Sequence, residues 1–335
     1  TAMISSFLFR ITKYIVIFCV IQSIISIFIY KSLDIPARTE FDQYIEKLNY
    51  LKKNPNDYKA IFLGSSHVQR CLDIDRFSRE TNLNSMNFGV SAVGIPRLVV
   101  LLDHLFEAIK QSSVKTIFLE LAGYQPIQDN HYIEMFYYNR NFLHEFDYFF
   151  KIPKKYRSRK SIKFSLYAAL RKFFSSTKLI FMTPKAVPIS KDIFGKYGYT
   201  FYTSPFSLDY LKKMHEEFMK NPENFTIQEY EPMYFMKDDN TLFFRYFKEI
   251  IQNYEDIGIK FIFFNSPGYS LTAIRSSFEN FVKSYPMITI SKKEYPEIFV
   301  KENYFNDSHL NINGTKLVTD IIINEYRSLT KKDAF

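Results

Sequence analysis

The sequence predicts an α/β fold in which helices flank a parallel β-sheet, because short apolar runs alternate with longer helical patterns from residue 58 onward. The glycines support the same fold, since the chain has only nine and four of them fall at or just past the end of an apolar run. In open parallel sheets, ligands bind at the edge where the strands end. We therefore expect a site near Gly64, Gly89, Gly123 and Gly268.

Each expected strand is a short run of apolar and aromatic residues that ends at a turn. The first run, Ala60 to Leu63, is wholly apolar, which is typical of a buried strand. The expected strands span residues 60–63, 85–88, 116–121, 260–264 and 287–290.

Helical patterns separate these strands. Between residues 95 and 111, apolar residues recur at helical spacing. Asp73 or Asp75 is expected to cap the helix that begins near Arg76. The expected helices span residues 76–81, 95–111, 240–256, 271–284 and 314–329.

Residues 1–31 contain an expected membrane anchor. The segment from Tyr14 to Tyr30 has about 17 residues without a charge, near the lower limit for a bilayer-spanning helix, and the apolar character begins near residue 7. Arg10 and Lys13 precede it, which favours a cytoplasmic N-terminus and a domain outside the bacterial cytoplasmic membrane. A cleaved signal peptide is an alternative, but no small-residue cleavage pattern follows Tyr30. A buried core helix is a third interpretation, although the segment has no polar face.

The rest of the chain divides into a connector and one large domain. Residues 32–57 are polar and helix-prone and form the expected connector, and residues 58–335 form the expected catalytic domain. Within this domain, residues 127–235 interrupt the alternation with aromatic and basic residues. We interpret them as an insertion that caps the sheet edge, either as a substrate lid, as a docking surface for a partner or as a structural elaboration.

Composition bounds the possible partners. The chain has 335 residues, of which 18% are aromatic, so global disorder is excluded. Its formal charge is +9. A basic balance favours attraction to an anionic lipid or cell-wall polymer, although an AT-rich genome, which favours Lys, Ile, Asn and Phe codons, explains the charge at least equally well. Nucleic acid is not expected, because no known binding motif is present.

Cys19 and Cys71 are not expected to pair, and no metal-ligand spacing occurs, so we expect no cofactor and no metal.

Two distant stretches carry the residue types of serine nucleophile chemistry. Ser66 follows the first strand in a tight turn, and residues 305–311 supply an imidazole and a carboxylate before the closing helix. A serine hydroxyl needs a neighbouring base, and the imidazole needs a partner that fixes its tautomer. The sequence therefore predicts Ser66 as the nucleophile, His309 as the general base and Asp307 as the residue that orients His309.

Each of these assignments has a plainer alternative. Ser66 could only cap the helix that follows it, and His309 could only stabilise its own loop. Asn306 or a backbone carbonyl could orient the imidazole in place of Asp307. His67, next to the nucleophile, is expected to be solvated or to face the substrate rather than to be catalytic.

These motifs resemble the SGNH (GDSL-like) hydrolase superfamily over residues 58–126 and 258–329. Ser66 stands at the position of the nucleophile in the first block, and residues 307–311 resemble the last block, in which Asn306 holds the position that is usually acidic. The resemblance implies a three-layer parallel-sheet SGNH-like domain. It also implies an oxyanion hole built by the N–H of Gly89 from the second block and by the side chain of Gln125, where the third block usually has asparagine. Gln125 as an ordinary surface residue is the alternative.

The expected anchor, the long insertion and the Asp-Ser-His-Leu-Asn ending resemble one membrane-anchored subset, the DltD-, AlgJ- and PatB-like proteins. These act beside a multi-pass membrane-bound O-acyltransferase. The resemblance implies transfer of an acetyl or similar small acyl group to a cell-envelope polysaccharide or teichoic-acid-like polymer. A membrane-tethered carbohydrate esterase or deacetylase, and a non-catalytic docking subunit of an O-acyltransferase complex, are the alternatives.

Overall fold

The computed structural model describes residues 12–14, 17, 18, 20, 21, 40–90, 95–121, 216–220, 242–267, 276–306 and 309–332. Most of the expected anchor and nearly all of the expected insertion lie outside these residues. Among the residues that are described, no helix is both long enough and apolar enough to cross a bilayer. The helices and strands discussed below all belong to one compact unit that begins at Glu40.

A parallel sheet forms the centre of this unit, and the α/β prediction is confirmed. Its five strands occur in the order β2-β1-β3-β4-β5, and every pair of neighbours is parallel. All five expected strands are present, with ends that differ from the expected ones by at most two residues. The strands are β1 (Ala60–Gly64), β2 (Ser85–Gly89), β3 (Thr116–Glu120), β4 (Lys260–Phe264) and β5 (Met287–Ile288).

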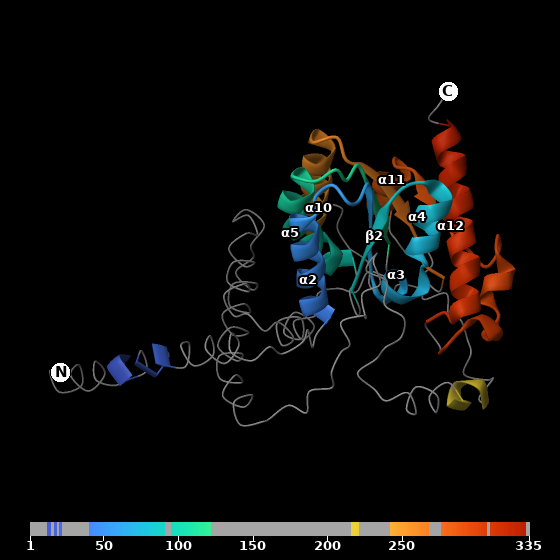
Figure 1. The fold of residues 1–335 in the computed structure, drawn as a ribbon, viewed down its shortest axis with the longest axis horizontal. Helices are drawn as coiled ribbons and strands as arrows, with labels where there is room; N and C mark the ends of the chain where they lie inside the picture. The colour runs from blue at the N-terminus through green and yellow to red at the C-terminus, as the bar shows by residue number, and fades with distance from the viewer. Residues whose placement is uncertain are drawn as a thin grey trace. The chain divides into compact units, whose positions relative to one another are not determined.

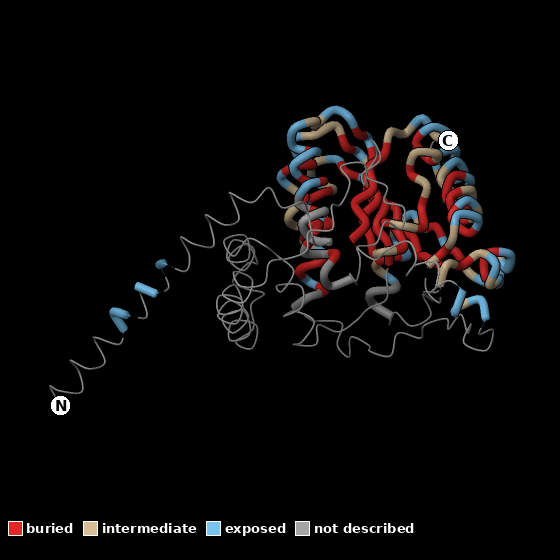
Figure 2. The backbone as a smooth tube through the Cα atoms, turned by 60° about the horizontal axis from the view of Figure 1, so that its bottom comes forward, coloured by how far each residue is buried: buried red, intermediate tan, exposed pale blue. Residues whose placement is uncertain are grey.

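Helices cover both faces of the sheet (Figure 1). One face carries α2 (Glu40–Lys53), α5 (Ile95–Lys110) and α10 (Leu242–Asp256). The other face carries α3 (Ser66–Cys71), α4 (Ile74–Thr81) and α12 (Ile312–Lys332). A further helix, α11 (Ser276–Lys283), packs against α10 through the ring of Phe281. The strands are therefore buried between two helical layers (Figure 2).

Aromatic side chains fill the layer between the sheet and α4 and α12. Successive residues of a strand point to opposite faces, so Phe62 of β1 and Phe118 of β3 share one face and stack with ring centroids 4.2 Å apart. Phe77 of α4 packs edge-on against Phe62, with centroids 4.9 Å apart, and Tyr326 of α12 contacts both Phe77 and Phe118. Stacked and edge-on rings add to the free energy gained by apolar burial, so this cluster joins α12 to the sheet both directly and through α4.

The first helix of the unit lies within the expected connector. Tyr44, Leu48 and Leu51 of α2 recur at helical spacing and are buried. The Tyr44 hydroxyl donates a hydrogen bond to the carbonyl of Leu101 in α5, at 2.7 Å. The segment predicted as a connector over residues 32–57 therefore contains a helix that packs into the domain, which its many charged residues obscured.

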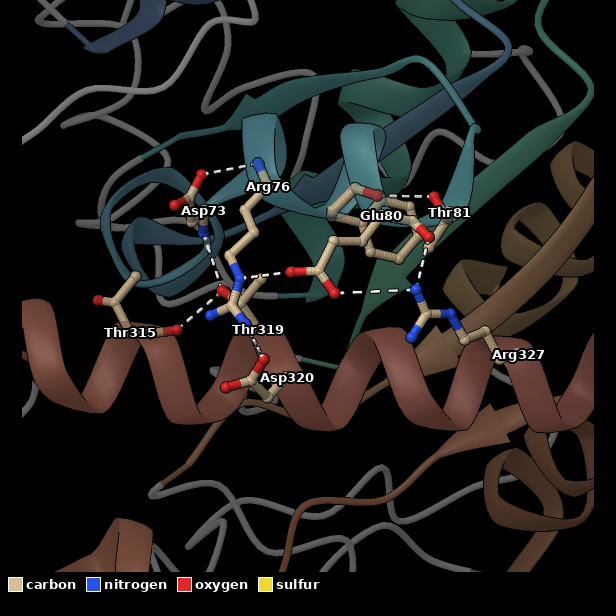
Figure 3. Close-up of polar contacts among 9 residues, drawn as sticks. Asp73, Arg76, Glu80, Thr81, Thr315, Thr319, Asp320 and Arg327 are labelled. Carbon is tan, nitrogen blue, oxygen red and sulfur yellow. Dashed lines mark hydrogen bonds and ion pairs between the residues drawn. The ribbon is translucent and has the colours of Figure 1, made fainter.

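Polar contacts fix α12 along α4 (Figure 3). The backbone N–H of Asp73 donates to the hydroxyl of Thr319 at 3.0 Å, and that hydroxyl donates to the carbonyl of Thr315 at 2.7 Å. Arg76 pairs with Asp320. Asp73 also caps α4, because its carboxylate accepts the N–H of Arg76 at 2.9 Å. Of the two expected caps, Asp73 and Asp75, the structure has Asp73 in this role. Since α4 follows α3 and α12 follows the His309 loop, these contacts hold together two segments that are distant in sequence.

We expect Thr319→Val to lower the free energy of unfolding by about 1–3 kcal/mol, because it keeps the side-chain shape but leaves the N–H of Asp73 without its acceptor. Chemical denaturation measures the change. Thr330→Val is the matched control, since Thr330 also donates to a carbonyl one turn back but is exposed. Equal stability of the two variants would contradict the structural role of Thr319.

Candidate active site

Polar side chains gather at the edge of the sheet where the strands end. Ser65 and Ser66 follow β1, Asn87 lies near the end of β2, Glu120 is the last residue of β3, and Ser266 lies just after β4. Because β2, β1, β3 and β4 are adjacent and parallel, these ends meet at one edge.

Ser66 and His309 contact each other at this edge. The Ser66 hydroxyl donates to Nε2 of His309, with 2.9 Å between Oγ and Nε2. The Nδ1 atom of His309 lies 3.1 Å from Oδ1 of Asn306, which also accepts the backbone N–H of His309 at 2.8 Å. Because this amide oxygen only accepts hydrogen bonds, Nδ1 carries the proton and Nε2 is the acceptor for the Ser66 hydroxyl. The pair thus has the geometry of a nucleophile and its general base.

The hydroxyl that caps α3 belongs to Ser65 and not to Ser66. Ser65 is the N-cap residue, and its Oγ accepts the backbone N–H of His67 at 3.2 Å. Ser66 is the first residue of α3 and does not cap it. Its hydroxyl contacts His309 instead. Its backbone N–H belongs to the first turn of the helix, whose N–H groups have no acceptor within the helix.

Asn306 orients His309 in this structure. The sequence predicted Asp307 for this role and left Asn306 as the alternative; Asp307 lies outside the described residues. An amide oxygen fixes the tautomer of the imidazole as a carboxylate does, but it brings no negative charge to stabilise an imidazolium.

Of the two expected oxyanion donors, Gly89 and Gln125, the structure describes only Gly89. Gln125 lies outside the described residues. The backbone N–H of Gly89 donates to Oδ1 of Asn87 at 2.8 Å, and Nδ2 of Asn87 donates to the carbonyl of Val68 at 2.7 Å. Asn87 is fully buried, and these two hydrogen bonds connect the end of β2 to α3. The side chain of Asn87 therefore accepts the Gly89 N–H that was expected to face the substrate.

His309 is held in its neutral form. Burial is the main cause that lowers the pKa of His309, from 6.5 to about 3, and the nearby charges of His67 and Arg70 lower it further. A neutral imidazole with an unprotonated Nε2 is the form that can accept the serine proton. The same shift affects stability, because between pH 6.5 and about 3 the unfolded chain binds a proton at His309 that the folded chain does not. Stability from this group is therefore complete above pH 6.5 and is lost as the pH falls toward 3.

We expect kcat/KM for an ester substrate to stay nearly constant from pH 7 to pH 5. For a base with an ordinary pKa near 6.5, the neutral fraction would fall about 25-fold over this range. Arg70→Gln removes one positive charge that lowers the pKa of His309, so it should move the acid limb of the profile to higher pH, whereas Arg70→Lys should not. An acid limb near pH 6.5 in the unaltered protein would contradict the burial of His309.

Asn306→Asp should also raise the pKa of His309, because it places a carboxylate where the amide oxygen now lies 3.1 Å from Nδ1. The acid limb of the kcat/KM profile should then move up by about one to two pH units. Asn306→Ala leaves Nδ1 without this acceptor and should lower kcat about 10-fold or more. If neither variant alters the profile or the rate, Asn306 does not orient the base.

Several residues of this edge were not predicted from the sequence. Glu120 accepts two hydrogen bonds beneath the serine turn, and Asn87 joins β2 to α3. His67 was expected to be solvated or to face the substrate, but it is buried and its ring stacks on that of His309. The signal in the sequence was a charged residue at the end of an apolar strand, since Glu120 terminates the run that begins at Thr116.

Cys71, which was not expected to pair, is a buried free thiol whose pKa burial raises to about 12.

Comparison of this chain with protein-family models, curated proteins and solved structures found no match.

Proposed function

We propose that this protein is a serine acyltransferase of the SGNH type that works through an acyl-serine intermediate on Ser66. The observation that carries the proposal is the hydrogen bond from Ser66 Oγ to His309 Nε2, at 2.9 Å, at the edge where parallel sheets bind ligands. The neutral state of His309 supports it, because the base must be unprotonated before the attack.

The reaction follows from this geometry in two transfers. Ser66 Oγ attacks the acyl carbonyl while its proton moves to Nε2 of His309, and the N–H of Ser66 stabilises the oxyanion. His309 then protonates the leaving group, and an ester of Ser66 remains. In the second transfer His309 removes the proton of the acceptor hydroxyl, whose oxygen attacks the acyl carbonyl. The bond from the acyl carbon to Ser66 Oγ then breaks, and His309 returns the proton to Ser66 Oγ. No step requires a metal or a cofactor.

The proposed acceptor is a cell-envelope glycan or teichoic-acid-like polymer, and the proposed group is acetyl or another small acyl group. The apolar segment over residues 7–30 supports an anchor in the cytoplasmic membrane with the domain outside, where such polymers lie. The formal charge of +9 favours an anionic acceptor. We propose a multi-pass membrane-bound O-acyltransferase as the partner that supplies the acyl group. An esterase would use the same acyl-serine and differ only in taking water as the acceptor.

The test is the intact mass of the protein after incubation with a chromogenic acetyl ester. We expect one added acetyl group on Ser66 in the unaltered protein and none in Ser66→Ala. Ser284→Ala, at an exposed serine distant in sequence from the site, should still be acetylated. An unmodified wild-type protein, or equal modification of the Ser66→Ala variant, would contradict the proposal.

A second measurement separates the enzymatic proposal from a docking role. In cells, Ser66→Ala should abolish acylation of the envelope polymer while the protein remains present at its normal level. Full acylation in these cells would indicate a subunit that only docks. Adding soluble oligosaccharide to the acetylated protein separates transferase from esterase, because only a transferase releases its acetyl group faster when the sugar is present.

A further inference from the structure

A buried carboxylate lies directly beneath the serine turn. Glu120 ends β3 and is fully buried. Its Oε2 accepts the backbone N–H of Ser65 at 2.5 Å, and its Oε1 accepts the hydroxyl of Ser266, which follows β4. Glu120 therefore joins the ends of β1 and β4 from the strand between them.

The same turn continues from Ser65 to His67. The Oγ of Ser65 lies 3.0 Å from Nδ1 of His67 and also accepts the backbone N–H of that residue. The Nδ1 atom of His67 is 3.9 Å from Oε1 of Glu120, and both side chains are buried. Thus Glu120 holds the backbone on one side of Ser66, and Ser65 and His67 hold the turn around it.

His67 connects this network to the base. Its ring stacks on the ring of His309, with centroids 5.4 Å apart and planes inclined by 21°. The contacts therefore form a closed path from Glu120 through Ser65 and His67 to His309, and from His309 back to Ser66. A displacement of Glu120 would change the positions of both the nucleophile and the base.

The end of β1 is built around this carboxylate. A Cβ atom at Gly64 would lie 2.5 Å from Oε2 of Glu120 and 2.6 Å from its Cβ, and 2.2 Å from Cγ2 of Val68. Distances this short do not occur between such atoms, so Gly64 leaves the space that Glu120 and α3 occupy.

Burial of a charge costs free energy unless its hydrogen bonds and partners compensate. Where a buried ion pair is replaced as a whole by well-packed apolar residues of similar volume, stability is often unchanged or higher. A fully buried carboxylate next to a nucleophile is therefore better explained by function than by stability.

We propose that Glu120 is a positioning residue, which holds the Ser65 backbone and the His67 ring so that Ser66 and His309 stay in reacting geometry. This inference rests on the proposed function, and it assigns Glu120 no direct contact with the substrate. Its charged oxygens make stronger hydrogen bonds than neutral ones, so they restrict the turn more tightly.

The test compares Glu120→Gln with the unaltered protein in three measurements: the rate of Ser66 labelling by a fluorophosphonate, the kcat and KM for a chromogenic acetyl ester, and the melting temperature. We expect labelling and kcat to fall at least tenfold, KM to change less than twofold, and the melting temperature to stay equal or rise. Glu294→Gln is the matched control, because Glu294 also accepts a serine hydroxyl, at 3.0 Å from Ser291, but is exposed. It should leave all three values unchanged.

Wild-type kinetics in Glu120→Gln would overturn the inference, and so would a loss of activity that merely follows a lower melting temperature. If Glu120→Gln does not fold, Ser266→Ala decides, because it removes one partner of Glu120 and keeps the charge. A threefold or greater loss of kcat at constant KM in that variant supports the role, and an unchanged kcat overturns it. Failure of the proposed function gives a different result, since the wild-type protein itself would then not be labelled.

Discussion

The hydrogen bond between Ser66 and His309 joins residues that are 243 positions apart, so it depends on how α12 is held. The packing of α12 along α4 supplies this constraint. The Asp73–Thr319 contact fixes the N-terminal half of α12, and Arg327 donates to the carbonyl of Glu80 at 2.6 Å nearer its C-terminal end. Because α4 follows the helix that carries Ser66, and α12 follows the loop that carries His309, one interface aligns Ser66 with His309.

Ser66, His309 and Asn306 form a row of hydrogen bonds in which no member carries a negative charge. Asn306 fixes the tautomer of His309 but offers no negative charge at Nδ1. A buried carboxylate, that of Glu120, is linked to this arrangement through Ser65 and His67. The imidazole of His309 is therefore a neutral acceptor, because burial lowers its pKa.

Much of the fold followed from the sequence, because buried strands and amphipathic helices leave clear patterns. The five strands and the closing helix were found near their expected bounds. The packing of α2 was not expected, since Tyr44 and Leu51 stand among charged residues that suggested a solvated segment.

The contacts within the site were harder to derive. Ser66 and His309 could be proposed as partners because each lies in a short motif that can be recognised from its neighbours in sequence. The structure brings the two residues together. The use of the Gly89 N–H by Asn87, and the position of Glu120 under the turn, depend on side chains from neighbouring strands that meet only after folding. Sequence order does not specify which of several polar groups at one edge will contact one another.

The short distance between position 64 and Glu120 has an evolutionary consequence. A side chain at position 64 requires residues 68 and 120 both to be smaller or displaced, because its Cβ atom would lie 2.2 Å from Cγ2 of Val68 and 2.6 Å from Cβ of Glu120. Position 64 should therefore keep glycine in descendants of this chain unless positions 68 and 120 change as well.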